Sequence, residues 1–432
     1  MTDTAHDIPV ADAARVDRLR AGLKRRYARE TRFRLYGLLA IGIAVGFLLL
    51  LLGRIIDQGH TAFYTNTITV PVYMDPARVN AAYPQGTNFE QLVAEQQLRR
   101  MNIVDDAQGT KASAMRRLFS SELKFVAAER VQRQPSLIGQ TVTIAAPVSD
   151  DADLYFKGKI KRDTPSDQRR LSDEQLTWLD DMKTAGQVSA HFNAGLFQRG
   201  DSTEPELAGV LGAVIGSAMM LLVTALIAIP LGVGAALYLE EFAPKNRITD
   251  IIEVNINNLA AVPSIIYGLL GLALFINWMH LPRASPLVGG LVLALMALPT
   301  IIIATRSSLK AVPPSIREAA LAMGASKTQT VFQHTLPLAM PGVMTGAIIS
   351  MAHALGETAP LLLIGMVSFV PGLPHSLVEP AGALPSLVYI WENASERAFH
   401  ERTAAAILVL LAFMIVMNAA AILLRRRFER RW

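Results

Sequence analysis

Two ionisable residues four positions apart interrupt an otherwise apolar run. Between Met340 and Val370 the only ionisable side chains are His353 and Glu357. Positions i and i+4 share one face of a helix, and an acidic side chain in the middle of a membrane costs about 2.5–3.5 kcal/mol. We predict that Glu357 contacts His353, or a basic group of another chain, and that both belong to a pathway or gate. Purely structural pairing is the alternative.

The segment 306–340 has the spacing of two short helices joined by a tight turn. Prolines 313 and 314 suit a helix start, and Gly324 suits a helix stop. Ser326 can cap a second short helix, which we expect Pro337 to end. Such a compact, alanine-rich element fits a groove on a partner. A plain amphipathic connector is the alternative.

Several chemistries are excluded by what the sequence lacks. With no cysteine, the chain has no disulfides, thiol nucleophiles or cysteine-ligated metal sites. The only Gly-Lys pair, Gly158-Lys159, is followed by isoleucine and makes no phosphate-binding loop. Neither a His-Glu-x-x-His nor a Gly-x-Ser-x-Gly motif occurs. We therefore expect no catalytic residues, no metal ligands and no cofactor bound by this chain.

The composition places these residues in a membrane protein. Hydrophobic residues make up 51% of the 432 residues and charged residues 18%, against about 25% charged in soluble domains. A bilayer is crossed by about 20 apolar residues in a helix, and the first apolar run lacks a cleavage site, so we expect an uncleaved anchor. The sequence predicts six spans near 35–53, 209–231, 256–277, 287–305, 341–366 and 403–424.

Basic residues set the predicted orientation. Twenty Lys or Arg residues lie in 1–34, 243–250, 306–340 and the C-terminal tail, against three in the opposite short loops. Positive residues favour the cytoplasmic side, so we expect both termini in the cytoplasm and 55–206 outside. The net charge of +5 then reflects topology and not nucleic-acid binding.

Residues 55–206 are predicted to form an α+β domain. Ser172 and Gln175 have the spacing of a capping box that opens a helix at Asp173–Thr184. A solvated accessory domain is one interpretation, and a sensor or docking domain is the other. The pattern predicts strands at Thr67–Met74, Thr141–Val148 and Leu154–Ile160, and further helices at Asn88–Arg100 and Lys111–Gln132.

The cytoplasmic segment resembles a known family. Its pattern is similar to the loop of binding-protein-dependent ABC importer permeases that docks into a cleft of the ATPase and transmits nucleotide-driven closure. The resemblance implies that the coupling residues are Arg317, Glu318, Ala319, Ala320, Gly324, Leu336 and Pro337.

Two further stretches, Val262–Leu272 and Ala354–Leu362, resemble PstA-type permeases of phosphate importers. The resemblance implies that ATP and Mg²⁺ are used by a partner ATPase dimer and not by this chain. Implied partners are a second, PstC-type permease, a periplasmic phosphate-binding protein and the lipid bilayer, in the bacterial inner membrane. Candidate pathway or gate residues are Pro263, Ser264, His353, Glu357 and Thr358.

The expected fold is an all-α polytopic membrane protein with six helices of the type I ABC importer permease fold, plus the α+β periplasmic domain between helices 1 and 2. Alternatives to phosphate import are a permease for another oxyanion or small solute, and a membrane-anchored sensor or signalling scaffold. The predicted parts are a cytoplasmic segment 1–34, an anchor helix 35–54, a periplasmic accessory domain 55–206, a permease core 207–425 and a basic tail 426–432.

Overall fold

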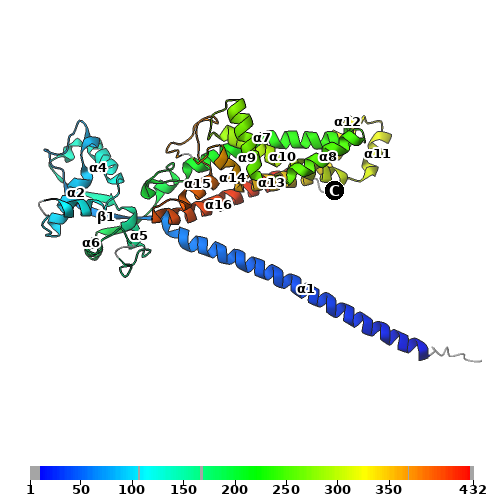
Figure 1. Ribbon diagram of the computed structural model, residues 1–432, viewed down its shortest axis with the longest axis horizontal. Coiled ribbons are helices and arrows are strands. Elements are labelled where there is room, and N and C mark those ends of the chain that lie inside the picture. The colour runs from blue at the N-terminus through cyan, green and yellow to red at the C-terminus, as the bar shows by residue number, and fades with distance from the viewer. Residues whose placement is uncertain (1–9, 106–107, 166–168, 368, 429–432) are drawn as a thin grey trace, which may run out of the picture. The chain divides into compact units, whose positions relative to one another are not determined.

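A computed structural model describes residues 10–105, 108–165, 169–367 and 369–428 (Figure 1). The chain divides into two compact units, Met1–Asp57 and Gln58–Trp432. The first unit contains most of helix α1 (Val10–Gly59), whose side chains are exposed from Leu35 to Leu51. An apolar surface of this length suits a bilayer. The predicted segment 1–34 and the basic tail lie partly outside the described residues.

A three-stranded antiparallel sheet follows α1 in the second unit. Strand β1 (Tyr64–Tyr73) lies between β2 (Thr141–Pro147) and β3 (Val188–Phe192). The register pairs Thr67 with Pro147 on one side and Ile68 with Val188 on the other. Alternate residues of β1 are buried, because successive side chains of a strand point to opposite faces.

Short helices cover this sheet and share one apolar core with it. The capping box of Ser172 and Gln175 opens α6 as predicted. The helices are α2 (Phe89–Arg100), α3 (Thr110–Arg116), α4 (Glu122–Arg133), α5 (Asp150–Phe156) and α6 (Asp173–Thr184), with 3₁₀ turns at η1 (His60–Phe63), η2 (Pro84–Gly86), η3 (Pro135–Leu137), η5 (Ala194–Phe197) and η6 (Pro205–Leu207).

Two elements predicted in this segment are wrong. The helix predicted over 111–132 is broken into α3 and α4, because Phe119 forms a β-bridge with Val148 between them. The strand predicted over 154–160 is the end of α5 and a turn. Three aspartates lie in the first turn of α5, where acidic side chains complement the helix dipole.

The rest of the second unit is mainly helical, with both long and short helices (Figure 1). Helix α10 packs against α7 and α13, and the Thr224 hydroxyl of α7 donates a hydrogen bond to the Gly290 carbonyl of α10 at 3.1 Å. The α-helices are α7 (Leu211–Leu237), α8 (Arg247–Ala260), α9 (Ser264–Gly271), α10 (Pro286–Lys310), α11 (Pro314–Ala322), α12 (Lys327–Gln329), α13 (Leu336–Gly356), α14 (Ala359–Leu363), α15 (Leu384–Glu392) and α16 (Arg397–Phe428), with π-helical turns at η7 (Tyr238–Phe242), η8 (Leu272–Trp278) and η9 (Thr330–Thr335).

By length and composition, five helical segments among the described residues could cross a membrane, or six if one bent pair counts as a single span. That pair is Arg247–Ala260 with Ser264–Trp278, which meet at 101°. The span predicted near 256–277 therefore corresponds to part of this bent pair and not to one continuous helix. The cause is Pro263, since the residue before a proline avoids the helical conformation.

Candidate coupling loop and translocation site

The predicted coupling segment folds into two helices, α11 and α12, joined by a turn at Gly324. Helix α11 begins after Pro313, and Gly324 adopts a φ of +85° that an L side chain rarely takes. Ser326 and Gln329 form a capping box that opens α12. Pro337 does not end this second helix, contrary to prediction. It lies inside a helical stretch that runs without a break from Lys327 to Gly356, two residues after the π-helical turn Thr330–Thr335.

The tip of this loop is open to solvent. Glu318 and Ala319 are exposed, whereas Ala320 is buried against the protein. Met323 beside the glycine turn is 88% exposed, and Leu321 and Phe332 are about half exposed. The loop therefore presents an apolar surface next to a carboxylate, and exposed apolar patches rimmed by polar groups are typical of protein contacts.

Arg317 anchors α11 to η7, the π-helical turn that follows α7. Its guanidinium donates to the Glu241 carboxylate at 2.7 and 3.1 Å, and to the carbonyls of Leu309 and Val312 at 2.9 and 2.8 Å. The Glu241 side chain is only 8% exposed. A two-pronged contact of this kind fixes orientation as well as distance. Sequence reasoning missed Glu241; the available signal was an acidic pair directly after an apolar run.

A second set of ion pairs surrounds this anchor. Arg306 of α10 contacts Glu240 of η7 at 3.3 Å and Glu253 of α8 at 2.8 Å. Lys310 also approaches Glu240, at 3.7 Å. The Lys327 ammonium lies 5.5 Å from the centre of the Phe242 ring. Ion pairs and one cation–ring contact thus join η7, the middle of α8, the C-terminal end of α10 and the loop residues Arg317 and Lys327.

The predicted pathway pair lies at a helix end. Helix α13 stops at Gly356, and Glu357 has extended backbone between α13 and α14. The prediction of one helix over 341–366, with Glu357 deep inside it, is therefore wrong, because Gly356 and Pro360 both disfavour a continuous helix. His353 Nε2 lies 3.2 Å from Glu357 Oε1, with 66% and 19% of the two side chains exposed.

The two stretches that contain the other pathway candidates pack against each other. Pro263 and Ser264 open α9, and Thr358 precedes α14. A Cβ added to Gly268 would lie 2.7 Å from Cα of Pro360. Only a glycine allows α9 and α14 to approach this closely. The structure thus brings the break at Pro263 and the break at Glu357 into one region.

A residue that sequence reasoning missed braces the bend at Pro263. The hydroxyl of Tyr267 donates a hydrogen bond to the carbonyl of Leu259 at 2.8 Å. This bond joins α9 to the end of α8 across the bend. The same Leu259 carbonyl, near the end of α8, also accepts from the backbone N–H of Val262 at 3.1 Å. The Tyr267–Leu259 hydrogen bond therefore stabilises the 101° angle between α8 and α9.

Buried charges join the α+β segment to the N-terminal end of α16. Lys157 contacts Asp153 at 2.6 Å and Glu401 at 2.7 Å. The guanidinium of Arg402 donates to the Ala208 carbonyl, just before α7, at 2.8 Å. Because a buried charge without a partner is costly, these contacts select one arrangement of the joint. None of them was predicted from the sequence, and two of the three join residues far apart along the chain, Lys157 with Glu401 and Arg402 with Ala208.

Two carboxyl groups beside this joint have raised pKa values. Burial raises the pKa of Glu206 to about 7, and the charges of Asp150 and Glu204 act in the same direction. Burial likewise raises the pKa of Asp151 to about 6, with Asp150 adding to it. Both groups therefore titrate between mild acid and neutral pH.

We expect the second unit to lose stability as the pH rises toward neutrality. Glutamate in an unfolded chain titrates near pH 4.3, so the stabilisation from protonating Glu206 is complete below about pH 4.3 and is lost as the pH passes through about 7. Thermal unfolding measured between about pH 5 and pH 8 should show this slope, and Glu206→Gln should reduce it. The exposed Glu174→Gln is the control; an equal reduction there would contradict the assignment.

Among the described residues, no group of three or more His, Cys, Asp or Glu side chains could hold a metal ion. The polar side chains described above instead contact one another or carbonyl groups. Their arrangement supports positioning and docking.

Comparison with known proteins defines the class of this protein. Residues 228–432 match the model of the "Binding-protein-dependent transport system inner membrane component" family, and residues 20–166 match a "Domain of unknown function (DUF3333)". The "Probable ABC transporter permease protein YqgI" of Bacillus subtilis is 32% identical over 230 residues, covering 49% of this chain and 76% of that protein. The chain belongs to the family of binding-protein-dependent transport system inner membrane components, whose members are transport permeases and not enzymes.

Relatives within this family include proteins named for phosphate. The "Phosphate transport system permease protein PstA 1" of Mycobacterium tuberculosis is 32% identical over 232 residues, covering 52% of this chain and 74% of that protein. PstA of Pasteurella multocida is 28% identical over 216 residues, covering 50% and 76%. The MetNI methionine ABC transporter in inward-facing conformations has a chain that is 20% identical, with 51% and 95% covered and a TM-score of 0.39.

Proposed function

We propose that this chain is a permease subunit of an ATP-driven importer of inorganic phosphate. The observation that carries the proposal is its 32% identity to a phosphate permease along 74% of that protein's length. A coupling loop with an exposed tip and an anchored base supports the same function. The membrane is the bacterial inner membrane, with both termini cytoplasmic and the α+β segment in the periplasm.

In the proposed mechanism the chain forms half of a pore. A periplasmic phosphate-binding protein delivers phosphate to the outer face, and a PstC-type permease supplies the other half. ATP and Mg²⁺ bind to a separate ATPase dimer, which closes and moves the loop that carries Glu318 and Gly324. Arg317 and Glu241 pass that movement to α7, because their contact is short and partly buried.

His353 and Glu357 form the proposed gate. A carboxylate repels phosphate, so Glu357 positions His353 and does not bind the anion. An imidazole N–H of His353 can donate a hydrogen bond to an anion, which a carboxylate cannot do. The large exposed fraction of His353 supports a place on the face toward the second permease or the pathway.

We expect Glu318→Lys to separate the ATPase from the membrane subunit. Reversing the exposed charge should reduce co-purification of the ATPase by about tenfold, since a like-charge contact at an interface costs at least 1.4 kcal/mol. The control is Asp250→Lys, an exposed acidic residue at the start of α8. Unchanged co-purification with Glu318→Lys would refute the docking role.

A further inference from the structure

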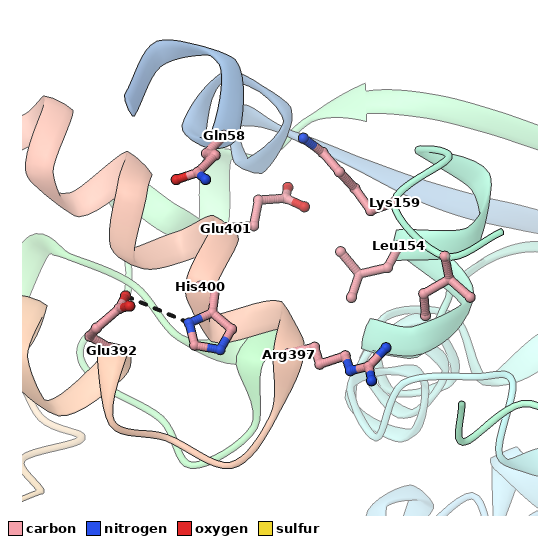
Figure 2. Close-up of a pocket in the computed structure, with 8 residues that line it drawn as sticks. Gln58, Leu154, Lys159, Glu392, Arg397, His400 and Glu401 are labelled. Atoms are coloured by element: carbon pink, nitrogen blue, oxygen red, sulfur yellow. Dashed lines mark ion pairs between the residues drawn. The ribbon is translucent and has the colours of Figure 1, made fainter. Parts of the chain in front are cut away.

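A pocket of about 290 Å³ lies where the α+β segment meets the outer end of α16 (Figure 2). Leu154 and Ile160 form an apolar part of its wall, and both are buried. Its polar lining comes from three separate places in the sequence and consists of Gln58, Lys159, Glu392, Arg397, His400 and Glu401.

The lining carries both signs of charge. His400 Nδ1 lies 3.6 Å from Glu392 Oε2, the ion pair dashed in Figure 2. Glu401 is the most buried of the charged groups, with its side chain 8% exposed. One of its oxygens accepts from Lys157 at 2.7 Å, while the other is buried without a hydrogen-bond partner among the described residues.

An unsatisfied buried carboxylate oxygen is unfavourable, because it has lost its hydration without gaining a hydrogen bond. A ligand that donates a hydrogen bond, above all a cationic one, would remove this cost. The neighbouring Arg397 and Lys159 instead favour an anionic group. The first turn of a long helix adds a partial positive charge, and Arg397 and His400 lie in the first turn of α16. The pocket is therefore suited to a ligand with a cation and an anion a few bonds apart.

The position of the pocket points to the membrane surface. Its α16 residues immediately precede the charge-free stretch 403–424, which lies in a helix that could span a bilayer. Gly59 packs closely on the backbone of Ala404, so Gln58 lies near the same level of α16. Side chains just outside an apolar span lie among lipid headgroups.

We propose that this pocket binds the zwitterionic phosphoethanolamine headgroup of a phospholipid. The phosphodiester contacts Arg397 and Lys159, and the ammonium donates to the free oxygen of Glu401. Leu154 and Ile160 cover the carbon atoms between them. The bound lipid would stabilise the joint between the α+β segment and α16. The assignment requires that α16 crosses the membrane, but it does not depend on the transported substrate.

Inorganic phosphate is a poorer fit to the same pocket. It has no ammonium group, and at neutral pH it would bring negative charge toward Glu401 and Glu392. Phosphatidylglycerol shares the phosphodiester but lacks the cation. Comparing these two compounds with phosphatidylethanolamine therefore shows whether the pocket recognises the zwitterion or only the phosphate group.

The test is lipid retention by the purified full chain. The protein is reconstituted in an equal mixture of phosphatidylethanolamine and phosphatidylglycerol, extracted gently and examined by native mass spectrometry. We expect about tenfold preferential retention of phosphatidylethanolamine, which corresponds to about 1.4 kcal/mol. Millimolar inorganic phosphate should not displace it, whereas soluble glycerophosphoethanolamine should.

Two variants test which residue contacts the ammonium end of the headgroup and which contacts its phosphodiester. Glu401→Gln keeps the shape and the acceptor for Lys157 but should abolish the preference between the two lipids. Arg397→Ala should weaken retention of both lipids, and the exposed Arg283→Ala is its control. Equal retention of both lipids by the unmodified chain, an unchanged preference in Glu401→Gln, or displacement by inorganic phosphate would each overturn the proposal.

Discussion

Replacing Arg317 with glutamate is expected to abolish ATP-driven transport while leaving the helices in the membrane. The substitution sets two carboxylates against each other at the base of the coupling loop, where Glu241 is nearly buried. Breaking a buried ion pair typically costs about 3 kcal/mol. That cost corresponds to roughly 100-fold in the equilibrium between an anchored and a released loop.

The reversed pair provides the control for this prediction. Arg317→Glu combined with Glu241→Arg restores opposite charges, so we expect it to recover a substantial part of the transport lost in the single variant. Uptake and ATP hydrolysis should be measured together in reconstituted vesicles. Hydrolysis that continues without uptake in the single variant would support a coupling role. Normal uptake in the single variant would contradict it.

Replacing Gly268 with leucine is expected to reduce phosphate transport about as strongly as Arg317→Glu does. The Cβ alone would lie 2.7 Å from Cα of Pro360 and 3.0 Å from its carbonyl oxygen, which are backbone atoms that cannot rotate away. Forcing such atoms apart usually costs about 1–3 kcal/mol. The strain would separate α9 from α14. The break at Pro263 would then move away from the break at Glu357, which belongs to the proposed gate.

Gly234 of α7 offers a matched comparison for Gly268. No described atom beyond its own helix turn and chain neighbours lies within 4 Å of a Cβ built there, so Gly234→Leu should leave transport nearly unchanged. Phosphate uptake and the amount of folded protein in the membrane are the two measurements. Loss of uptake with normal membrane content in Gly268→Leu supports a gate. Unaffected uptake would show that the α9–α14 contact has no role in transport.

The sequence predicted the features that depend on local composition. Apolar runs located the long helices, and the capping box at Ser172 and the glycine turn at Gly324 are set by residues within a few positions. The family followed from a short motif in the coupling segment. All of these signals lie within a few turns of the chain, where local rules hold.

The features that were missed depend on contacts between distant residues. Arg317 and Glu241 are 76 positions apart, and Lys157 and Glu401 are 244 apart, so neither pair has a signature in a local window. Pro263 was visible in the sequence, but a proline in an apolar run is compatible with a mild kink as well as with a 101° bend. Packing of α9 against α14 selects the sharper form.

The central claim is tested most directly by uptake of labelled anions. Vesicles that contain this chain with its ATPase, its second permease and its binding protein are supplied with phosphate, sulfate or molybdate. We predict ATP-dependent uptake of phosphate that excess sulfate and molybdate do not reduce. Uptake of sulfate or molybdate that proceeds independently of phosphate, with no phosphate uptake, would contradict the account.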